Sequence, residues 1–557
     1  MNAIHHAKDR LRLTLDALLP RRKALAELRE QWGKPGGKHE PFAGRWFQLT
    51  RPATACVDDK TWADLEFPRL FADLDTTVTP LGSQALHKQL REYVDDPAEL
   101  AARHAMHEQL RDAPVLRDAP VLREHLQLGL LPLRESSHAH VVDALYADIP
   151  EPPARRGLLS LWSALSLALM VAVIGWSWSA WWWLALLPVN AAILYRYSWR
   201  SLREIDALGG CLRMLGVAEA LCSIKSELPL LQALREERAA RNEVRGASWL
   251  MHACKLDIVS WMMPWLNVAF LLELVVHVWS MEQFYRLREK LHPTFGLVGG
   301  IDAAIALASA LAMHPRHCQP ELAATPTLEI LEGCHPLLPD GVCNSIRLDG
   351  RSALVTGSNM AGKTTFVKML AINAILGRTA GFCLASRAVL PRLPVMAAIR
   401  GEHSVESGKS HYFAEIEAIR GFLDSEAHHG GGLLFVLDEP FSGTNTIERI
   451  AIASAVLRAL GEHSLVLVTT HDVELQAMLG ERYALYHFQE NPEVDGYFDY
   501  RLRTGAAIER NAIRLLARMG FPPEVVDAAM DCVKRAGQAA SSTHAGIVVP
   551  GAGIEPA

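Results

Sequence analysis

The stretch Thr356–Thr365 reads TGSNMAGKTT. It fits the pattern G-x-x-x-x-G-K-[ST] at Gly357, Gly362, Lys363 and Thr364, which is the pattern of a phosphate-binding loop. The apolar run SALVT comes before it and an apolar helical pattern comes after it, which is the context that such a loop requires. Glycines allow the backbone to wrap phosphates, and the helix N-terminus adds a positive dipole. The stretch therefore predicts an α/β domain that binds ATP.

The side chains of this loop have separate expected roles. Lys363 would reach the β- and γ-phosphates, and Thr364 would place its hydroxyl on Mg²⁺. The predicted cofactor is therefore Mg²⁺ together with ATP. The residues expected to bind ATP are Gly357, Ser358, Asn359, Met360, Ala361, Gly362, Lys363, Thr364 and Thr365.

Two further apolar runs read as buried strands that end in polar residues. LLFVLDEP ends in Asp438, which would hold the Mg²⁺ hydration shell, and Glu439, which would polarise the attacking water. In SLVLVTTHD the strand pattern ends at His471, which could sense the γ-phosphate or position water, or could be an ordinary hydrogen-bonded histidine. The predicted catalytic residues are Lys363, Glu439 and His471, and the predicted metal ligands are Thr364 and Asp438.

The bulk composition limits the other possibilities. The chain has 557 residues, which suggests three or four domains, and its formal net charge of -6 is unlike that of a strongly basic nucleic-acid binder. Nine cysteines show no C-x-x-C spacing, which argues against a structural zinc site. The first 32 residues are polar and helix-like and do not resemble a secretory signal.

A long apolar stretch covers residues 157–197 and contains no Asp, Glu, Lys or Arg before Arg196. It suits two short membrane spans joined near Trp176–Ser179, since a bilayer core needs about 20 helical residues. Arginines on both flanks predict that both ends lie in the cytoplasm. We therefore expect a protein of the bacterial inner membrane with a cytoplasmic ATPase domain. The alternative is a cytoplasmic protein in which this hairpin is buried in a soluble core.

A second apolar run covers residues 258–281 and contains Pro264, Glu273 and His277. A single extra span would put the C-terminal half on the wrong side of the membrane. We therefore expect a buried or membrane-grazing helix here, with a paired re-entrant segment as the alternative.

These patterns predict an α plus α/β multidomain fold, in which a mostly helical region with a transmembrane hairpin precedes a P-loop ATPase domain. The expected divisions are an N-terminal helical segment (1–63), the two parts of the helical core (64–156 and 198–324), the hairpin between them (157–197), the ATPase domain (325–537), and a disordered tail (538–557).

Several segments together resemble the MutS family of mismatch-repair ATPases. TGSNMAGKTT is similar to its phosphate loop, LDEPFSGTNT to its acidic strand and following loop, and TTHDVEL to its histidine switch. ESGKSHYFAEI, which begins at residue 406, looks like the signature segment that reaches the nucleotide of the partner subunit. Upstream, residues 74–90 and 301–322 are similar to the two ends of the helical core domain of that family.

The resemblance implies an ABC-type ATPase domain, with a C-terminal dimerisation segment that ends near residue 537, and a helical core that acts as a lever. It also implies an ATP-hydrolysing homodimer in which Ser407, Gly408 and Ser410 contact the nucleotide in trans. It also implies possible binding of mismatched or branched DNA. The chain departs from the family pattern, because only residues 1–63 precede the helical core. That length is too short for the mismatch-reading domain with its Phe-x-Glu wedge, and Phe413–Glu415 and Phe488–Glu490 both lie in the ATPase domain.

The sequence thus predicts a membrane-associated, ATP-driven dimeric switch of the MutS type without the mismatch-reading wedge. Two alternatives remain open. One is a soluble ATPase of DNA repair or recombination, and the other is a regulatory ATPase for a membrane partner with no role on DNA.

Overall fold

The protein is described here by a computed structural model that covers residues 22–38, 40–52, 56–112, 121–147, 156–247, 263–399, 411–429, 432–490, 498–506 and 520–532. The chain divides into two compact units. The first consists of Met1–Pro339 and Met369–Ala397, and the second of Asp340–Lys368 and Ala398–Ala557.

The first unit is helical apart from a few short strands. Its helices are α2 (Arg45–Thr50), α3 (Asp59–Asp64), α4 (Phe67–Leu74), α5 (Pro80–Arg91), α6 (Pro97–Arg111), α7 (Leu122–Leu130), η1 (Leu131–Leu133), η2 (Ser136–His140), α8 (Val141–Tyr146), α9 (Arg156–Gly175), α10 (Trp181–Leu184), α11 (Leu187–Cys222), α12 (Pro229–Glu236), α13 (Arg238–Ala247), α16 (Met263–Phe270), α17 (Leu272–Leu287), η3 (Arg288–Leu291) and α18 (His292–Met313). Its strands are β1 (Glu321–Ala323), β2 (Thr327–Gly333), β5 (Arg387–Pro391) and β6 (Val395–Ala398). β5 pairs in parallel with β1 and antiparallel with β2.

The core of this unit is built around α18, which is buried along most of its length. The Asp302 carboxylate on α18 accepts hydrogen bonds from the amides of Val78 (3.0 Å) and Thr79 (2.8 Å) and from the Thr79 hydroxyl (2.8 Å). Burial raises the pKa of Asp302 to about 6. A carboxylate from α18 therefore satisfies the free backbone donors at the start of α5, which positions these two helices.

The two helices also approach each other closely at glycines. A Cβ atom on Gly82 of α5 would lie 2.2 Å from Oδ2 of Asp302, and one on Gly299 of α18 would lie 2.7 Å from the Leu81 carbonyl. The packing of α5 against α18 thus depends on the absence of side chains at both positions.

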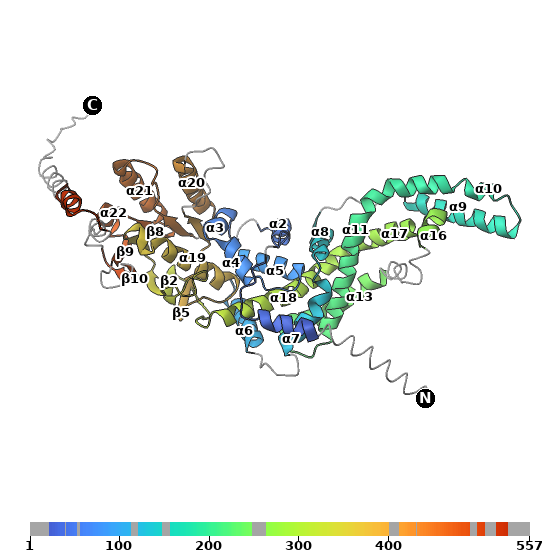
Figure 1. Ribbon diagram of the computed structural model, residues 1–557, viewed down its shortest axis with the longest axis horizontal. Helices are drawn as coiled ribbons and strands as arrows, with labels where there is room; N and C mark the ends of the chain where they lie inside the picture. The colour runs from blue at the N-terminus through green and yellow to red at the C-terminus, as the bar shows by residue number, and fades with distance from the viewer. Residues whose placement is uncertain are drawn as a thin grey trace, which may run out of the picture. The chain divides into compact units, whose positions relative to one another are not determined.

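α9, α10 and the start of α11 form a helical hairpin with its turn at residues 176–180 (Figure 1). The turn lies where the apolar pattern predicts the junction. The second arm is not a separate short helix, because α11 continues without interruption to Cys222 and so runs through the expected division at residue 197. No proline occurs in α11 after its first turn, so nothing in the sequence breaks it there.

Two described helical stretches are long and apolar enough to cross a membrane. One is Gly157–Gly175, of which 11% is buried, and the other is Glu282–Met313, of which 78% is buried. The second stretch consists largely of α18 and belongs to the helical core. The first belongs to the hairpin and is mostly exposed, together with the shorter apolar stretch Trp181–Tyr195.

The run at 258–281, expected as one helix, contains two described helices, α16 and α17. They are separated at Leu271, which has a φ of 54°. Residues 258–262 lie outside the described residues. The helices pack beside the base of the hairpin, where Leu159 of α9 shares an apolar cluster with Leu271, Leu274 and Val278.

The second unit is an α/β domain. Its elements are β3 (Asn344–Asp349), β4 (Ser352–Thr356), η4 (Asn359–Ala361), the start of α19 (Lys363–Thr379), α20 (His411–His429), β7 (Leu434–Asp438), α21 (Thr446–Leu460), β8 (Leu465–Thr470), α22 (Glu474–Leu479), β9 (Tyr483–Glu490) and β10 (Phe498–Thr504). Within this unit the strand order is β10-β9-β4-β8-β7. β9, β4, β8 and β7 are parallel and β10 is antiparallel to β9.

The central strands β4, β7 and β8 are buried at every residue, as their unbroken apolar sequences predict. Because they are parallel neighbours, their carboxyl ends meet at one edge of the sheet. A helix-rich chain with a sheet in each unit agrees with the expected α plus α/β class.

Gly82→Ala should lower the free energy of unfolding of the first unit by about 1–3 kcal/mol, because the added methyl group overlaps Asp302. Urea denaturation of the purified protein, followed by circular dichroism, measures the change. The matched control is Gly216→Ala in α11, where an added Cβ meets nothing within 4 Å. That variant should gain about 0.5–1 kcal/mol from improved helix propensity. Equal midpoints for the two variants would contradict the close approach of α5 and α18.

Candidate active site

The loop after β4 has the backbone that a phosphate-binding loop needs. Gly357 has a φ of 141°, and a Cβ atom there would lie 2.8 Å from the Phe488 carbonyl. Gly362 has a φ of 92° and directly precedes α19, and a Cβ atom there would lie 3.1 Å from the Tyr500 ring. Side chains are thus excluded at both ends of the loop, for conformational and steric reasons. Between them the loop connects β4 to the N-terminus of α19, as the pattern predicts.

Lys363 is buried beneath this loop, with only 2% of its side chain exposed. Its ammonium donates to the Gly357 carbonyl at 2.7 Å and lies 3.3 Å from Oε1 of Glu439. Burial lowers the pKa of Lys363, and the carboxylates of Glu439 and Asp438 oppose that shift. The structure thus brings Lys363, which is predicted to contact the phosphates, next to Glu439, the predicted catalytic carboxylate.

The two predicted metal ligands are also in contact. The Thr364 hydroxyl donates to Oδ2 of Asp438 at 2.8 Å, and the Thr469 hydroxyl donates to Oδ1 of Asp438. The cluster joins the ends of β7 and β8 to the start of α19 and offers oxygen atoms only. Oxygen donors of this kind suit Mg²⁺. Across the part of the chain that the structure describes, no group of three or more His, Cys, Asp or Glu could hold a metal ion.

Glu439 follows β7 with a φ of 50°, an unusual backbone conformation for a residue with a side chain. Its amide donates to the Thr469 carbonyl at 3.0 Å, which stabilises this turn against β8. Its carboxylate lies between the Lys363 ammonium and Nδ1 of His471, the latter at 3.6 Å. Non-glycine residues in such conformations cluster at functional sites, because the surrounding contacts must offset a local cost of about 1–3 kcal/mol.

The charge of this cluster bears on what it can bind. Lys363 contributes one positive charge, and Asp438 and Glu439 contribute two negative charges, so the three groups sum to about -1. A polyphosphate would be repelled unless a divalent cation came with it. Ser358 Oγ in the loop is buried and has no partner among the described residues, so it is available to an incoming acceptor. The residues present therefore fit a phosphate chain accompanied by Mg²⁺.

An ion pair beside this cluster was missed by the sequence analysis. Arg449 of α21 donates to both oxygens of Asp472, from Nε at 2.8 Å and from a terminal nitrogen at 2.6 Å. The Arg449 side chain is 13% exposed and the Asp472 side chain 6%. Since Asp472 directly follows His471, the pair fixes the backbone that carries the predicted switch histidine. Asp472 was visible in the motif, but no sequence signal identified its partner.

The end of β4 is held in a similar way. Gln476 of α22 donates to the Thr356 hydroxyl at 2.8 Å, and that hydroxyl donates to the Tyr486 carbonyl at 3.3 Å. Beyond β7, the amide of Phe441 donates to a carboxylate oxygen of Glu415 on α20 at 2.5 Å. These hydrogen bonds hold the backbone around the candidate site in place.

Some predicted residues cannot be placed. Ser407, Gly408 and Ser410 lie outside the described residues, as does every other position of 400–410. Asn359, Met360 and Ala361 form the short helix η4 within the loop, and Met360 is exposed. Thr365 is exposed in the first turn of α19.

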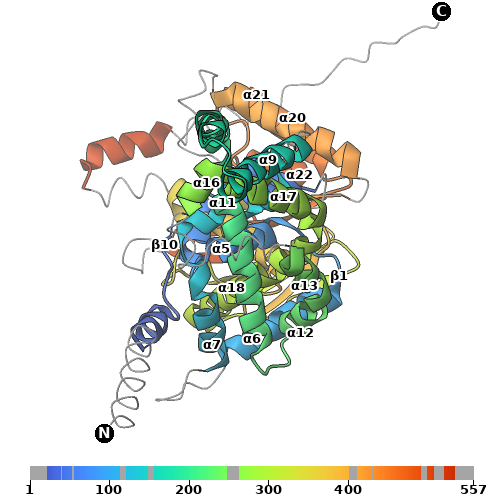
Figure 2. The same ribbon diagram turned by 90° about the vertical axis from the view of Figure 1, so that its right-hand side faces the viewer.

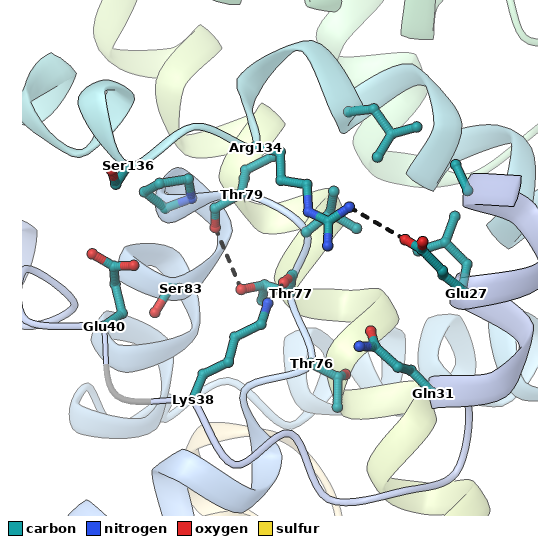
Figure 3. A pocket seen from close by; sticks show the side chains of 15 residues that line it. Glu27, Gln31, Lys38, Glu40, Thr76, Thr77, Thr79, Ser83, Arg134 and Ser136 are labelled. Carbon is teal, nitrogen blue, oxygen red and sulfur yellow. Dashed lines mark hydrogen bonds and ion pairs between the residues drawn. The ribbon is translucent and has the colours of Figure 1, made fainter. Parts of the chain in front are cut away.

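A separate hollow of about 190 Å³ lies in the first unit, between residues 24–40 and the turn that leads into α5 (Figure 3). Lys38 and Arg134 reach this hollow in Figure 3, but both have partners. Lys38 donates to the Thr77 carbonyl, and Arg134 lies 3.6 Å from Glu27. None of the predicted site residues lines it, and we assign it no ligand.

Comparison with known proteins adds an independent finding. Residues 353–536 match the family model of MutS domain V. The chain is 32% identical over 267 residues to a DNA mismatch repair protein MutS of Chloroflexus aurantiacus. The aligned region covers 44% of this chain and 27% of that relative. It is 30% identical over 251 residues to the Thermus aquaticus protein of the same name, covering 44% of this chain and 30% of the relative. It is also 30% identical over 203 residues to an Endonuclease MutS2 of Thermus thermophilus, covering 36% and 27%. The chain thus spans less than a third of the length of these relatives.

Arg449→Ala should lower the stability of the second unit by about 3–5 kcal/mol, because it leaves the Asp472 carboxylate buried without its cation. Arg458→Ala is the matched control, since Arg458 lies on the same helix but donates to the Met478 carbonyl at the surface, and it should change stability by about 0.5 kcal/mol or less. Chemical denaturation of both variants checks the difference. Adding Asp472→Asn to Arg449→Ala should restore part of the loss, and no restoration would show that the pair is not the cause.

Proposed function

We propose that the chain, whose residues 353–536 match MutS domain V, is a Mg²⁺-dependent ATPase of the MutS type that works as a membrane-associated homodimeric switch. The observation that carries this proposal is the grouping of Lys363, Glu439 and His471 beside Thr364 and Asp438. All five stand where the phosphate loop meets the carboxyl ends of β7 and β8.

In the proposed reaction ATP is bound through the loop backbone, the Ser358 hydroxyl and the Lys363 ammonium. Lys363 is paired with Glu439 in this structure, and the γ-phosphate would compete with that carboxylate for the ammonium. Glu439 would then be free to accept a hydrogen bond from the attacking water and polarise it. His471, 3.6 Å from the same carboxylate, would orient Glu439 or the water.

Thr364 and Asp438 would hold Mg²⁺, the first through its hydroxyl and the second through the ion's hydration shell. When bound, Mg²⁺ supplies positive charge that neutralises the phosphates beside the two carboxylates. The Thr469 hydroxyl keeps one Asp438 oxygen oriented, so that the other faces Thr364.

Lys363→Ala should weaken ATP binding, because it removes the cation under the loop, whereas Glu439→Gln should retain binding and slow hydrolysis by about 100-fold or more. Nucleotide affinity and phosphate release in the presence of Mg²⁺ measure the two effects. Arg458→Ala, remote from Lys363 on the surface of α21, is the control and should behave as the parent protein. Unchanged hydrolysis in both site variants would refute the assignment.

We also propose that the protein binds DNA, because the relatives that it matches are named as DNA mismatch repair and endonuclease proteins. Measuring the same hydrolysis with homoduplex, mismatched and branched DNA at several salt concentrations tests it, because DNA contacts to Lys and Arg weaken steeply with salt. Hydrolysis insensitive to every DNA would favour the regulatory ATPase of a membrane partner.

The proposed dimer is tested by sedimentation of Glu439→Gln, in which bound ATP should persist. We expect this variant to form dimers when ATP is added.

The membrane part of the proposal is supported by the surface of the hairpin. Residues 157–195 contain no charged side chain, and large apolar side chains such as Leu161 (68% exposed), Ile174 (73%) and Trp181 (78%) face outward. Soluble monomers rarely expose contiguous apolar patches of more than a few hundred Å². A bilayer would cover this surface, and the tryptophans at the turn suit an interface between lipid and water.

The parent chain should sediment with membranes and require detergent for extraction. Leu167→Arg should reduce the membrane-bound fraction, because a charge in the middle of an apolar helix costs about 2.5–3.5 kcal/mol on insertion. Ser177→Arg places the same charge in the turn and serves as the control, with little expected change. Recovery of the parent protein in the high-speed supernatant without detergent would rule out the membrane hairpin.

A further inference from the structure

The break between α16 and α17 leaves backbone groups that need partners. The chain leaves α16 at Leu271, where φ is 54°. The carbonyls of Val268, Ala269 and Phe270 therefore belong to the last turn of that helix. The last carbonyls of a helix lack partners within it and must find them elsewhere. In water such carbonyls are hydrated, whereas in hydrocarbon they need protein donors.

The partners of these carbonyls come from the hairpin. The Asn190 amide, on α11, donates to the carbonyls of Val268 and Ala269, both at 3.0 Å. The Ser163 hydroxyl, on α9, donates to the Phe270 carbonyl at 2.5 Å. All three carbonyls at the break are therefore satisfied by side chains of the two hairpin arms.

Asn190 is itself held in place. The indole nitrogen of Trp162 donates to Oδ1 of Asn190 at 2.8 Å, and Asn190 is fully buried. Both of its amide hydrogens and its oxygen are thus used. A second indole, that of Trp279 on α17, donates to the Ser160 hydroxyl at 3.0 Å. Asn190, Ser163 and Trp162 thus form a hydrogen-bonded group with the α16 carbonyls.

Large apolar side chains are exposed on the same helices. α16 and α17 expose Trp265, Val268, Leu272 and Trp279, and beside them α9 exposes Leu161 and Leu167. Figures 1 and 2 show α16 and α17 running alongside α9 and α11. Buried, hydrogen-bonded polar side chains beside exposed large apolar ones suit a protein segment surrounded by lipid.

We propose that α16 and the first half of α17 enter the bilayer beside the hairpin as a re-entrant pair, and that Asn190 holds this pair in place. The inference rests on the proposed membrane hairpin and extends it to a second segment of the chain. Phe270 contacts α9 at Ser163, and Ser163 is seven residues beyond Arg156, so the break lies about 10 Å along the hairpin from its charged base. That depth is about a third of a bilayer core of roughly 30 Å, where lipid covers the exposed faces.

Single cysteines test the proposal in membrane vesicles that contain the full-length protein. The positions are Leu272 and Trp265 for the re-entrant pair, Leu167 for the hairpin, and the exposed Ser223 as the water-accessible control. Each chain is treated with a water-soluble maleimide and compared with the parent protein, which gives the background of native cysteines. A bimane label at the same positions is then exposed to nitroxide-bearing lipids, which quench fluorescence only on contact.

We expect Leu272→Cys, Trp265→Cys and Leu167→Cys to resist the maleimide until detergent is added, and their bimane labels to be quenched by the lipid nitroxide. Ser223→Cys should react at once. If Leu167→Cys is protected and the other two react, the re-entrant pair is wrong and the hairpin stands. If Leu167→Cys reacts as well, the membrane proposal itself fails. Protection without lipid quenching would mean that protein covers α16 and α17, which also overturns the inference.

Asn190→Leu tests the part played by the buried amide. It removes both donors to the α16 carbonyls, so Leu272→Cys should lose its protection in this background while Leu167→Cys keeps it. Retained protection at Leu167 shows that the hairpin is still inserted, which separates this result from misfolding. Val189→Leu changes the exposed neighbouring residue and should leave both positions protected. Protection of Leu272→Cys that survives Asn190→Leu would refute the role of Asn190.

Discussion

The buried ammonium of Lys363 is the interaction on which the candidate site depends. It donates to the carbonyl at the start of its own loop and lies beside the carboxylate that follows β7. A cation that is 2% exposed needs such partners, since burial disfavours its charged form. The same contacts bring Glu439 toward the loop, and Glu439 in turn lies within 3.6 Å of His471. One buried charge therefore lies where the residues that follow three strands come together around the loop at residues 357–362.

The surroundings of that charge explain why the arrangement is stable. Asp438 accepts hydrogen bonds from Thr364 and Thr469, and the bidentate pair of Arg449 and Asp472 fixes the residue after His471. Each of these groups is buried or nearly so, and each is paired. Two carboxylates and one ammonium leave a negative balance, so a divalent cation would favour the binding of a phosphate ligand here. That coupling is a property of the charges and does not depend on the identity of any relative.

The apolar arm of the first unit would follow the same rule in the bilayer that we propose for it. Asn190 and Ser163 satisfy the carbonyls that the break at Leu271 exposes, while the outer faces of α9, α16 and α17 carry Leu, Val and Trp side chains. A polar group without a partner costs more where water is absent. The inward hydrogen bonds and the outward apolar side chains are therefore two consequences of one constraint. The relatives match only part of this chain, and the apolar arm lies outside residues 353–536, which match MutS domain V.

The sequence by itself determined the elements whose signal is local. TGSNMAGKTT required a strand, a glycine loop and a helix, and the runs ending in Asp438, Glu439 and His471 had the length and composition of buried strands. The uncharged stretch after residue 156 predicted a helical hairpin with its turn near Trp176. In each case the residues that fix the conformation are neighbours along the chain, so their spacing carries the information.

Only the tertiary structure decided which distant residues meet. Nothing in the sequence around Arg449 indicates that it pairs with Asp472, and nothing around Asn190 indicates that it bonds to the carbonyls of Val268 and Ala269. The division of 258–281 at Leu271 is of the same kind, because the break is satisfied by donors from helices about 80 and 110 residues earlier. Local patterns set backbone conformation, whereas hydrogen-bond partners across the chain depend on how the helices and strands pack.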